Sequence, residues 1–76
     1  MIKAYVLIEV EGIESNKVAK ELTQLEEVEN INLVNGDYDL ISLVKAKNVI
    51  DLKELALEKI GKVKGVNRTN TFIIAD

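Results

Sequence analysis

The feature that most constrains the fold of this chain is an Asn35-Gly36 pair with a strand pattern on each side. Apolar and polar residues alternate over Val28–Val34 before the pair, and Tyr38–Ala46 after it is rich in apolar residues. Asn and Gly tolerate the positive φ angles that a tight two-residue hairpin requires. We therefore predict that the two stretches are neighbouring antiparallel strands joined by a tight turn.

Two further strands are predicted at the ends of the chain. Ile2–Val10 is almost wholly apolar and rich in Val and Ile, which favours a strand, and the last strand is expected over Val66–Ala75. Side chains alternate between the faces of a strand. One face of the first strand therefore carries Ile2, Ala4, Val6, Ile8 and Val10, and one face of the third carries Leu40, Ser42, Val44 and Ala46.

The segment between the first two strands has a helical pattern. Ser15 or Asn16 can cap the free backbone N–H groups at its start, and Val18, Leu22 and Leu25 follow at i, i+4 and i+7. We predict a short amphipathic helix with this stripe inward.

A second helix is predicted between the third and fourth strands. Asn48 and Asp51 resemble an N-terminal cap pair, and Gly61–Gly65 ends the helix. Its inner stripe is formed by Leu52, Leu55, Ala56 and Ile60. Lys59 also falls in this stripe, so we expect its stem to lie along the core while its ammonium reaches water, without a functional role as a buried charge.

The resulting order βαββαβ predicts an α+β, ferredoxin-like fold with a four-stranded antiparallel sheet in the order 2-3-1-4. Two helices cover only one face of such a sheet. The uncovered face carries Tyr5, Leu7, Ile41 and Leu43, and by the same alternation Val34. Burial of apolar surface stabilises by about 25 cal/mol per Å², so we predict a homodimer, an α/β sandwich, through this face.

Composition supports self-association and narrows the partners. Residues 1–76 are read as a single domain whose own core is small, and the absence of Cys and His excludes disulfides and imidazole metal ligands as reinforcement. Ten basic and thirteen acidic residues give a net charge of −3, which disfavours direct nucleic-acid binding. No apolar run approaches the roughly 20 residues of a membrane span, and a cytoplasmic location is expected.

Two polar clusters are candidates for ligand binding. The first is Asn35–Asp39 at the hairpin and the second is Arg68–Thr71 in the last strand. An amino-acid zwitterion needs an acceptor for its ammonium and donors for its carboxylate, which such residues supply. The same residue types are also ordinary components of tight hairpins and β-strands.

Enzyme chemistry has little support in the sequence. No His or Cys is present, and Ser15 and Ser42 have no recognisable partner for acyl transfer. Nothing resembles an EF-hand or a phosphate-cradling glycine loop. We therefore predict no catalytic residue, no metal site and no cofactor.

Three segments carry a resemblance to a known family: Ala4–Val10, Gly36–Leu40 and Gly65–Thr71. Over essentially the whole chain the sequence resembles the ligand-binding domain of the Lrp/AsnC regulators, the feast/famine proteins. The resemblance implies dimers joined through their sheets, octameric or decameric rings of dimers, and amino acids bound between neighbouring dimers. It assigns the effector loop to Gly36, Asp37, Tyr38 and Asp39, and the facing strand to Thr69 and Thr71.

The resemblance also has a departure. Full-length members carry an N-terminal helix-turn-helix domain, whereas here Met1 is followed at once by the first strand pattern. The sequence thus resembles the stand-alone members, which implies a role in transcription regulation through amino-acid sensing, or through mixed assembly with full-length Lrp/AsnC regulators, without direct DNA binding.

Three alternatives to an effector-binding module stay open. The chain could be purely an assembly partner of a DNA-binding relative. It could be an ACT-like regulatory domain of a metabolic enzyme, in which sheet edges pair side by side. A dimeric barrel enzyme of the monooxygenase type is disfavoured by the lack of His and by the crowded apolar sheet face. The sequence leaves open whether Arg68 points to ligand, subunit or solvent.

Overall fold

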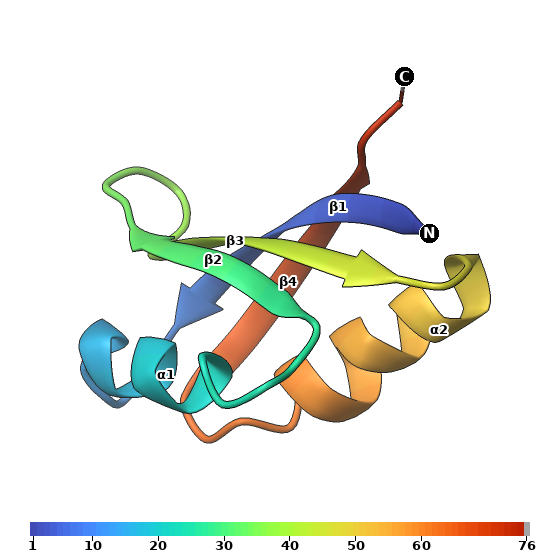
Figure 1. The fold of residues 1–76 in the computed structure, drawn as a ribbon. Coiled ribbons are helices and arrows are strands. Elements are labelled where there is room, and N and C mark those ends of the chain that lie inside the picture. The colour runs from blue at the N-terminus through green and yellow to red at the C-terminus, as the bar shows by residue number, and fades with distance from the viewer. Residues whose placement is uncertain (76) are drawn as a thin grey trace.

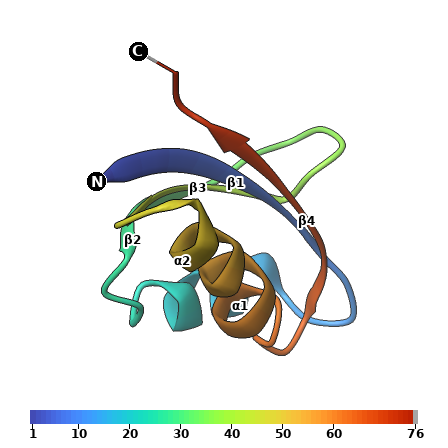
Figure 2. The same ribbon diagram turned by 90° about the vertical axis from the view of Figure 1, so that its right-hand side faces the viewer.

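The computed structural model describes residues 1–75. The elements along the chain are β1 (Ile2–Val10), α1 (Ser15–Leu22), β2 (Val28–Leu33), β3 (Leu40–Ala46), α2 (Val49–Glu54), the π-helical turn η1 (Leu55–Ile60) and β4 (Val66–Ile73). The strands form one antiparallel sheet in the order β2-β3-β1-β4, and the helices lie together on one side of it (Figures 1 and 2). The predicted ferredoxin-like fold and sheet order are therefore confirmed.

The core lies between the sheet and the helices. The strand faces predicted to point inward are buried except at Ile2 and Val10, which are half-buried at the ends of β1. The helices bury Val18, Leu22, Leu52 and Ile60 against them. One polar side chain is buried there: the Ser42 hydroxyl donates to the Val6 carbonyl oxygen at 3.0 Å. This bond satisfies the hydroxyl, which would otherwise cost about 1–3 kcal/mol to bury.

The connection between β2 and β3 is wider than the sequence predicted. β2 ends at Leu33 and β3 begins at Leu40. The predicted strands, which ended at Val34 and began at Tyr38, were therefore one and two residues too long. No residue other than glycine has a positive φ among the described residues, which excludes the two-residue turn predicted at Asn35-Gly36. The prediction was wrong because Asp39 is held by β1, and the Val34 N–H donates to its carbonyl at 2.9 Å, closing a larger loop.

The two helix starts have different outcomes. The Ser15 or Asn16 cap was wrong: α1 begins at Ser15, its N-cap is Glu14, and no side chain caps it. The backbone N–H of Lys17 bonds the Glu14 carbonyl instead, at 3.0 Å. The cap pair of the second helix is confirmed, since the Asn48 side chain accepts from the Asp51 N–H at 2.8 Å.

Smaller differences concern the element ends. α1 stops at Leu22, so Leu25, predicted as its last inner residue, lies in the following turn, where it packs half-buried on the core. β4 ends at Ile73, two residues before the predicted strand end at Ala75.

The second helix changes its winding halfway. Over Leu55–Ile60 it is a π-turn, and the Gly61 N–H bonds the Ala56 carbonyl five residues back, at 2.9 Å. In an α-helix the residue four positions after Leu55 would also face inward. The wider turn brings Ile60 into the core and moves Lys59 to the flank, where its ammonium is accessible as predicted.

Candidate functional site

The β2–β3 loop is positioned by two hydrogen bonds with β1. Asp39 Oδ2 accepts a hydrogen bond from the Val10 N–H at 2.7 Å, and the Asp39 N–H donates to the Ile8 carbonyl at 2.9 Å. The loop projects beyond the end of the sheet (Figure 1). Gly36 and Asp37 are exposed, while Tyr38 and Asp39 are half-buried. The Asp39 carboxylate thus anchors the loop, and the Asp37 carboxylate remains accessible to a ligand or a partner.

Arg68 connects the loop to the open face of the sheet. Its guanidinium carbon lies 5.1 Å from the centre of the Tyr38 ring, a cation–π distance. Its Nη2 also lies 3.3 Å from Glu9 Oε2, and Asn67 Nδ2 donates to the other oxygen of that carboxylate. Within this chain Arg68 therefore points to Glu9 and Tyr38, a placement that the sequence left open.

Thr69 and Thr71 lie on the other side of the sheet. Their register partners in β1 are Ile8 and Val6, whose side chains are buried under the helices. Both threonines line a groove of about 510 Å³ between the edge strand β4 and the second helix. The other lining residues are Val49, Leu52, Lys53, Ala56, Leu57 and Ile73.

Within one chain, the loop and the threonine groove do not form a common pocket. None of the four predicted loop residues lines the groove. The groove has an apolar wall, two half-buried threonines and the outer edge of β4, which has a sheet neighbour on one side only. On one chain, the two predicted halves of the effector site are therefore separate.

The four residues predicted for the dimer interface are neighbours on the uncovered sheet face. Tyr5 is in register with Leu43, and Leu7 with Ile41. On the other side of β1, Phe72 is in register with Tyr5, and these two aromatic side chains are 53% and 42% exposed. Sequence reasoning missed Phe72, although the same alternation in the last strand would have placed it there.

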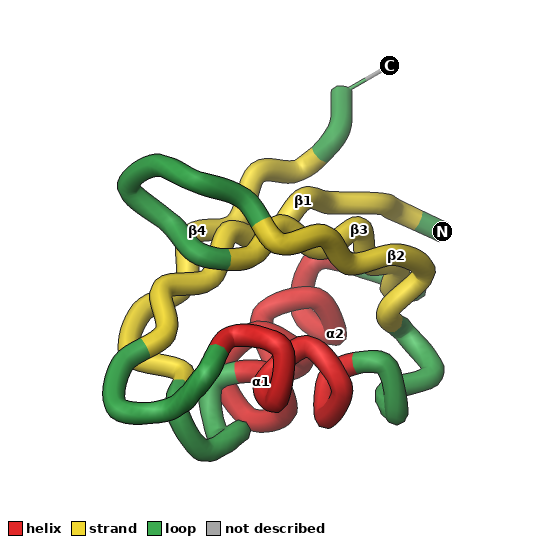
Figure 3. The backbone as a smooth tube through the Cα atoms, turned by 90° about the vertical axis from the view of Figure 1, so that its left-hand side faces the viewer, coloured by secondary structure: helices red, strands yellow, loops and turns green. Residues whose placement is uncertain are grey.

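Figures 2 and 3 show this face of the sheet without a covering helix. Charged side chains border the apolar centre. Lys3 and Lys45 lie 3.2 Å and 3.9 Å from the two carboxylate oxygens of Glu29. The face thus has an apolar middle and a polar border, as protein interfaces do.

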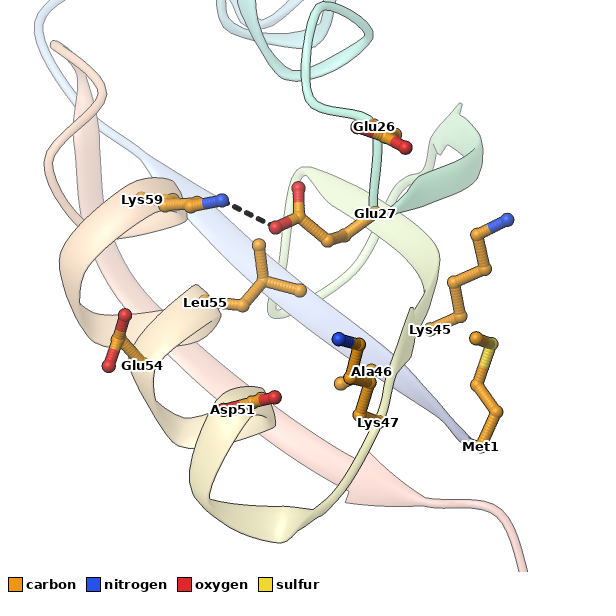
Figure 4. A pocket seen from close by; sticks show the side chains of 10 residues that line it. All are labelled: Met1, Glu26, Glu27, Lys45, Ala46, Lys47, Asp51, Glu54, Leu55 and Lys59. Atoms are coloured by element: carbon orange, nitrogen blue, oxygen red, sulfur yellow. Dashed lines mark hydrogen bonds and ion pairs between the residues drawn. The ribbon is translucent and has the colours of Figure 1, made fainter.

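A third candidate is a cavity of about 410 Å³ at the opposite end of the sheet from the loop, lined by acidic and basic side chains from α2, η1, β3 and the α1–β2 connection (Figure 4). Its central contact joins Lys59 Nζ to Glu27 Oε2 at 2.5 Å. The hydrogen bond from Lys59 lowers the pKa of Glu27, and the same bond raises the pKa of Lys59. These two charges satisfy each other, which indicates a structural role for the pair.

Neither a metal centre nor a membrane span is found in the part of the chain that the structure describes. No group of three or more His, Cys, Asp or Glu residues within residues 1–75 is arranged to hold a metal ion. Among the same residues, no helix has the length and apolar character needed to cross a bilayer.

The fold, with a bare apolar sheet face and a polar loop at the end of the sheet, defines a small α+β domain of the ferredoxin-like class. The sequence profile of the Lrp/AsnC ligand binding domain matches residues 3–76, and the chain belongs to this family. The predicted family is thereby confirmed, and the ACT-like and monooxygenase-type alternatives are set aside.

Curated relatives are transcription regulators. An uncharacterized HTH-type transcriptional regulator of Pyrococcus furiosus is 33% identical over 73 residues, which are 96% of this chain and 49% of the relative. The chain spans about half the length of the curated relatives it matches.

Solved structures agree closely with the fold. A protein of Thermus thermophilus superposes with a TM-score of 0.91 at 33% identity, covering 100% of this chain and 95% of that one. The feast or famine regulatory protein of M. tuberculosis, complexed with L-methionine, superposes with a TM-score of 0.87 at 27% identity, covering 100% of this chain and 51% of that one.

Proposed function

We propose that this chain is a non-catalytic, amino-acid-binding and oligomerising module that contributes to transcription regulation. The observation that carries the proposal is the separation of the two polar elements: the loop with Asp37 and Tyr38, and the groove with Thr69 and Thr71, lie apart on one chain. A site that uses both is completed only when neighbouring chains bring them together. The related M. tuberculosis protein complexed with L-methionine supports an amino acid as the ligand.

The chemistry of the two elements suits a zwitterion. On one chain, the carboxylate of Asp37 accepts from the ligand ammonium, with Gly36, Tyr38 and Asp39 shaping the loop. On the neighbouring chain, the Thr69 and Thr71 hydroxyls donate to the ligand carboxylate. The groove around the threonines is lined by Val49, Leu57 and Ile73. We therefore infer that the effector has an apolar side chain, which these residues remove from water.

Self-association is the second part of the proposal. The face with Tyr5, Leu7, Ile41 and Leu43 is apolar and bare, and Phe72 extends it. A second copy presents the same face, so a two-fold dimer buries both. Octameric or decameric rings of such dimers then place the loop of one dimer near the groove of the next.

The remaining partners follow from charge and family. Copies of this chain, an amino acid and full-length Lrp/AsnC regulators are the proposed partners, in the cytoplasm. The net charge of −3 argues against direct contact with nucleic acid. A pure assembly role, without an effector, is the second candidate, since the bare sheet face alone supports it.

Calorimetric titration with L-methionine and then with the other amino acids tests the effector role. We expect binding by the wild type and a loss of roughly tenfold in affinity for Thr71→Val, which keeps the shape but removes a hydroxyl and leaves the ligand carboxylate without that donor. Thr23→Val is the matched control, because Thr23 lies at the end of α1 and bonds the Lys20 carbonyl. If no amino acid binds at millimolar concentration while native mass spectra still show the oligomer, only the assembly role survives.

A further inference from the structure

A second groove, of about 630 Å³, lies between α1 and the segment around the end of η1. It shares no lining residue with the threonine groove or the β2–β3 loop. Five lysines line it, against a single acidic residue, Glu21: Lys17, Lys20, Lys59, Lys62 and Lys64. The whole chain has ten basic residues and a net charge of −3, so half of its cations gather at one groove of an acidic protein.

Most of this positive charge is not neutralised within the chain. Lys59 pairs with Glu27, and Lys17 lies 3.9 Å from Glu14. Lys20, Lys62 and Lys64 form no ion pair with the described residues 1–75. Lysines near the carboxyl ends of helices stabilise the helix dipole, but that role does not require lysines from α1 and from the η1 segment to meet at one groove.

Beneath the lysines the groove has an apolar floor. Ile13 and Val63 line it, and both are half-buried against the core. Gly65 fixes the position of Ile13: its φ is +97°, and a Cβ added there would lie 2.0 Å from Ile13 Cγ2. The Gly65 backbone therefore packs directly against the Ile13 side chain, with no room for a side chain at position 65.

We propose that this groove binds a small phosphate-bearing molecule of the nucleoside polyphosphate class. The lysine ammonium groups contact the phosphates, and the base lies over Ile13 and Val63. Lysine is a compact point charge suited to phosphate, and the groove volume falls within the roughly 300–1,000 Å³ of small-molecule sites. Duplex DNA fits less well, since its rigid array of charges extends past the groove to an acidic surface that includes Glu26 and Glu54 of the adjacent cavity.

Equilibrium titrations with inorganic tripolyphosphate and with adenosine triphosphate test the proposal. We expect both to bind, the nucleotide more tightly because of the apolar floor, and both to weaken as salt concentration rises. The double variant Lys62→Gln, Lys64→Gln is expected to bind either probe about tenfold more weakly. The double variant Lys3→Gln, Lys47→Gln changes net charge equally outside both grooves and is expected to bind like the wild type. Thermal melting establishes that both variants fold.

The other outcomes overturn the proposal. Equal losses in the two double variants mean that overall charge, not the groove, attracts the anion. Tighter binding of polyglutamate than of tripolyphosphate points to an acidic protein segment, and tighter binding of a duplex oligonucleotide points to nucleic acid. If neither phosphate probe binds, the proposed site does not exist. L-methionine titrations are independent of each of these results, because the grooves share no residue.

Discussion

At the scale of single residues, Asp39 holds the proposed effector loop against β1. Its carboxylate accepts from the Val10 N–H at 2.7 Å, across 29 positions in sequence. The neighbouring Asp37 is exposed at the loop tip. Two carboxylates that look equivalent in the sequence therefore have different tasks: Asp39 orients the loop, and Asp37 is the one left accessible to a ligand.

The different tasks lead to a test by urea denaturation at fixed protein concentration. Asp39→Ala leaves the Val10 N–H without its partner, so we expect the free energy of unfolding to fall by about 1–3 kcal/mol. For Asp37→Ala we expect a change of no more than about 0.5 kcal/mol, typical of exposed positions. Equal effects of the two substitutions would contradict this division of roles.

At the scale of elements, alternation and amphipathicity were sufficient to predict every strand and both helices, but not how they are wound or closed. Asn35-Gly36 has the composition of a tight turn, yet Asp39 bonds to β1, a contact distant in sequence that a local pattern cannot reveal. The π-turn was missed for the same kind of reason. Lys59 fits an α-helical stripe, whereas the wider turn places it beside Glu27, a residue distant in sequence.

Gly61 is the residue that tolerates this turn. A Cβ at Gly61 would lie 2.8 Å from the Leu57 carbonyl oxygen and 3.0 Å from that of Ala56. We expect Gly61→Ala to lower stability by about 1–3 kcal/mol, because the backbone must shift to relieve the overlap. Glu58→Ala, an exposed substitution in the same turn, is the control and should have little effect on the urea midpoint. An unchanged midpoint for Gly61→Ala would show that the turn relaxes without cost.

The Lys59–Glu27 pair makes stability depend on pH. Since Lys59 lowers the folded-state pKa of Glu27 below its ordinary 4.5, the contribution of Glu27 is complete above pH 4.5 and is lost as the pH falls through the lowered value. The pKa of Lys59 is raised above 10.5, so its contribution is complete below pH 10.5 and is lost as the pH rises through the raised value.

Thermal melts at several pH values test the direction of this pH dependence. Glu27→Gln should melt below the wild type near neutrality, and the difference should shrink once the pH falls below the lowered pKa of Glu27. Glu58→Gln, at an exposed position whose charge is not among the causes of either pKa shift, should melt like the wild type throughout. A difference for Glu27→Gln that persists in strong acid would mean that the ion pair is not its source.

At the scale of the whole molecule, the proposed self-association depends on the uncovered apolar face of the sheet. The sequence alone allowed prediction of the fold, the strand order and four apolar side chains of that face, because strand alternation carries this information. Alternation also places Thr69 and Thr71 on the opposite face from Arg68, but the contact between Arg68 and Tyr38 could not be predicted, since it joins β4 to a loop distant in sequence. The separation of the threonines from the loop is the reason that the proposed effector site needs two chains.

Sedimentation equilibrium over a range of concentrations tests the central claim most directly. The wild type should be a dimer or a larger assembly at micromolar concentration. Leu43→Glu, which places a charge in the middle of the bare face, should shift it to monomer. Leu33→Glu, at an exposed position in register with Leu40 near the end of β2, should not. A well-folded wild-type monomer at high concentration, with Tyr5 and Phe72 exposed to water, would contradict the account.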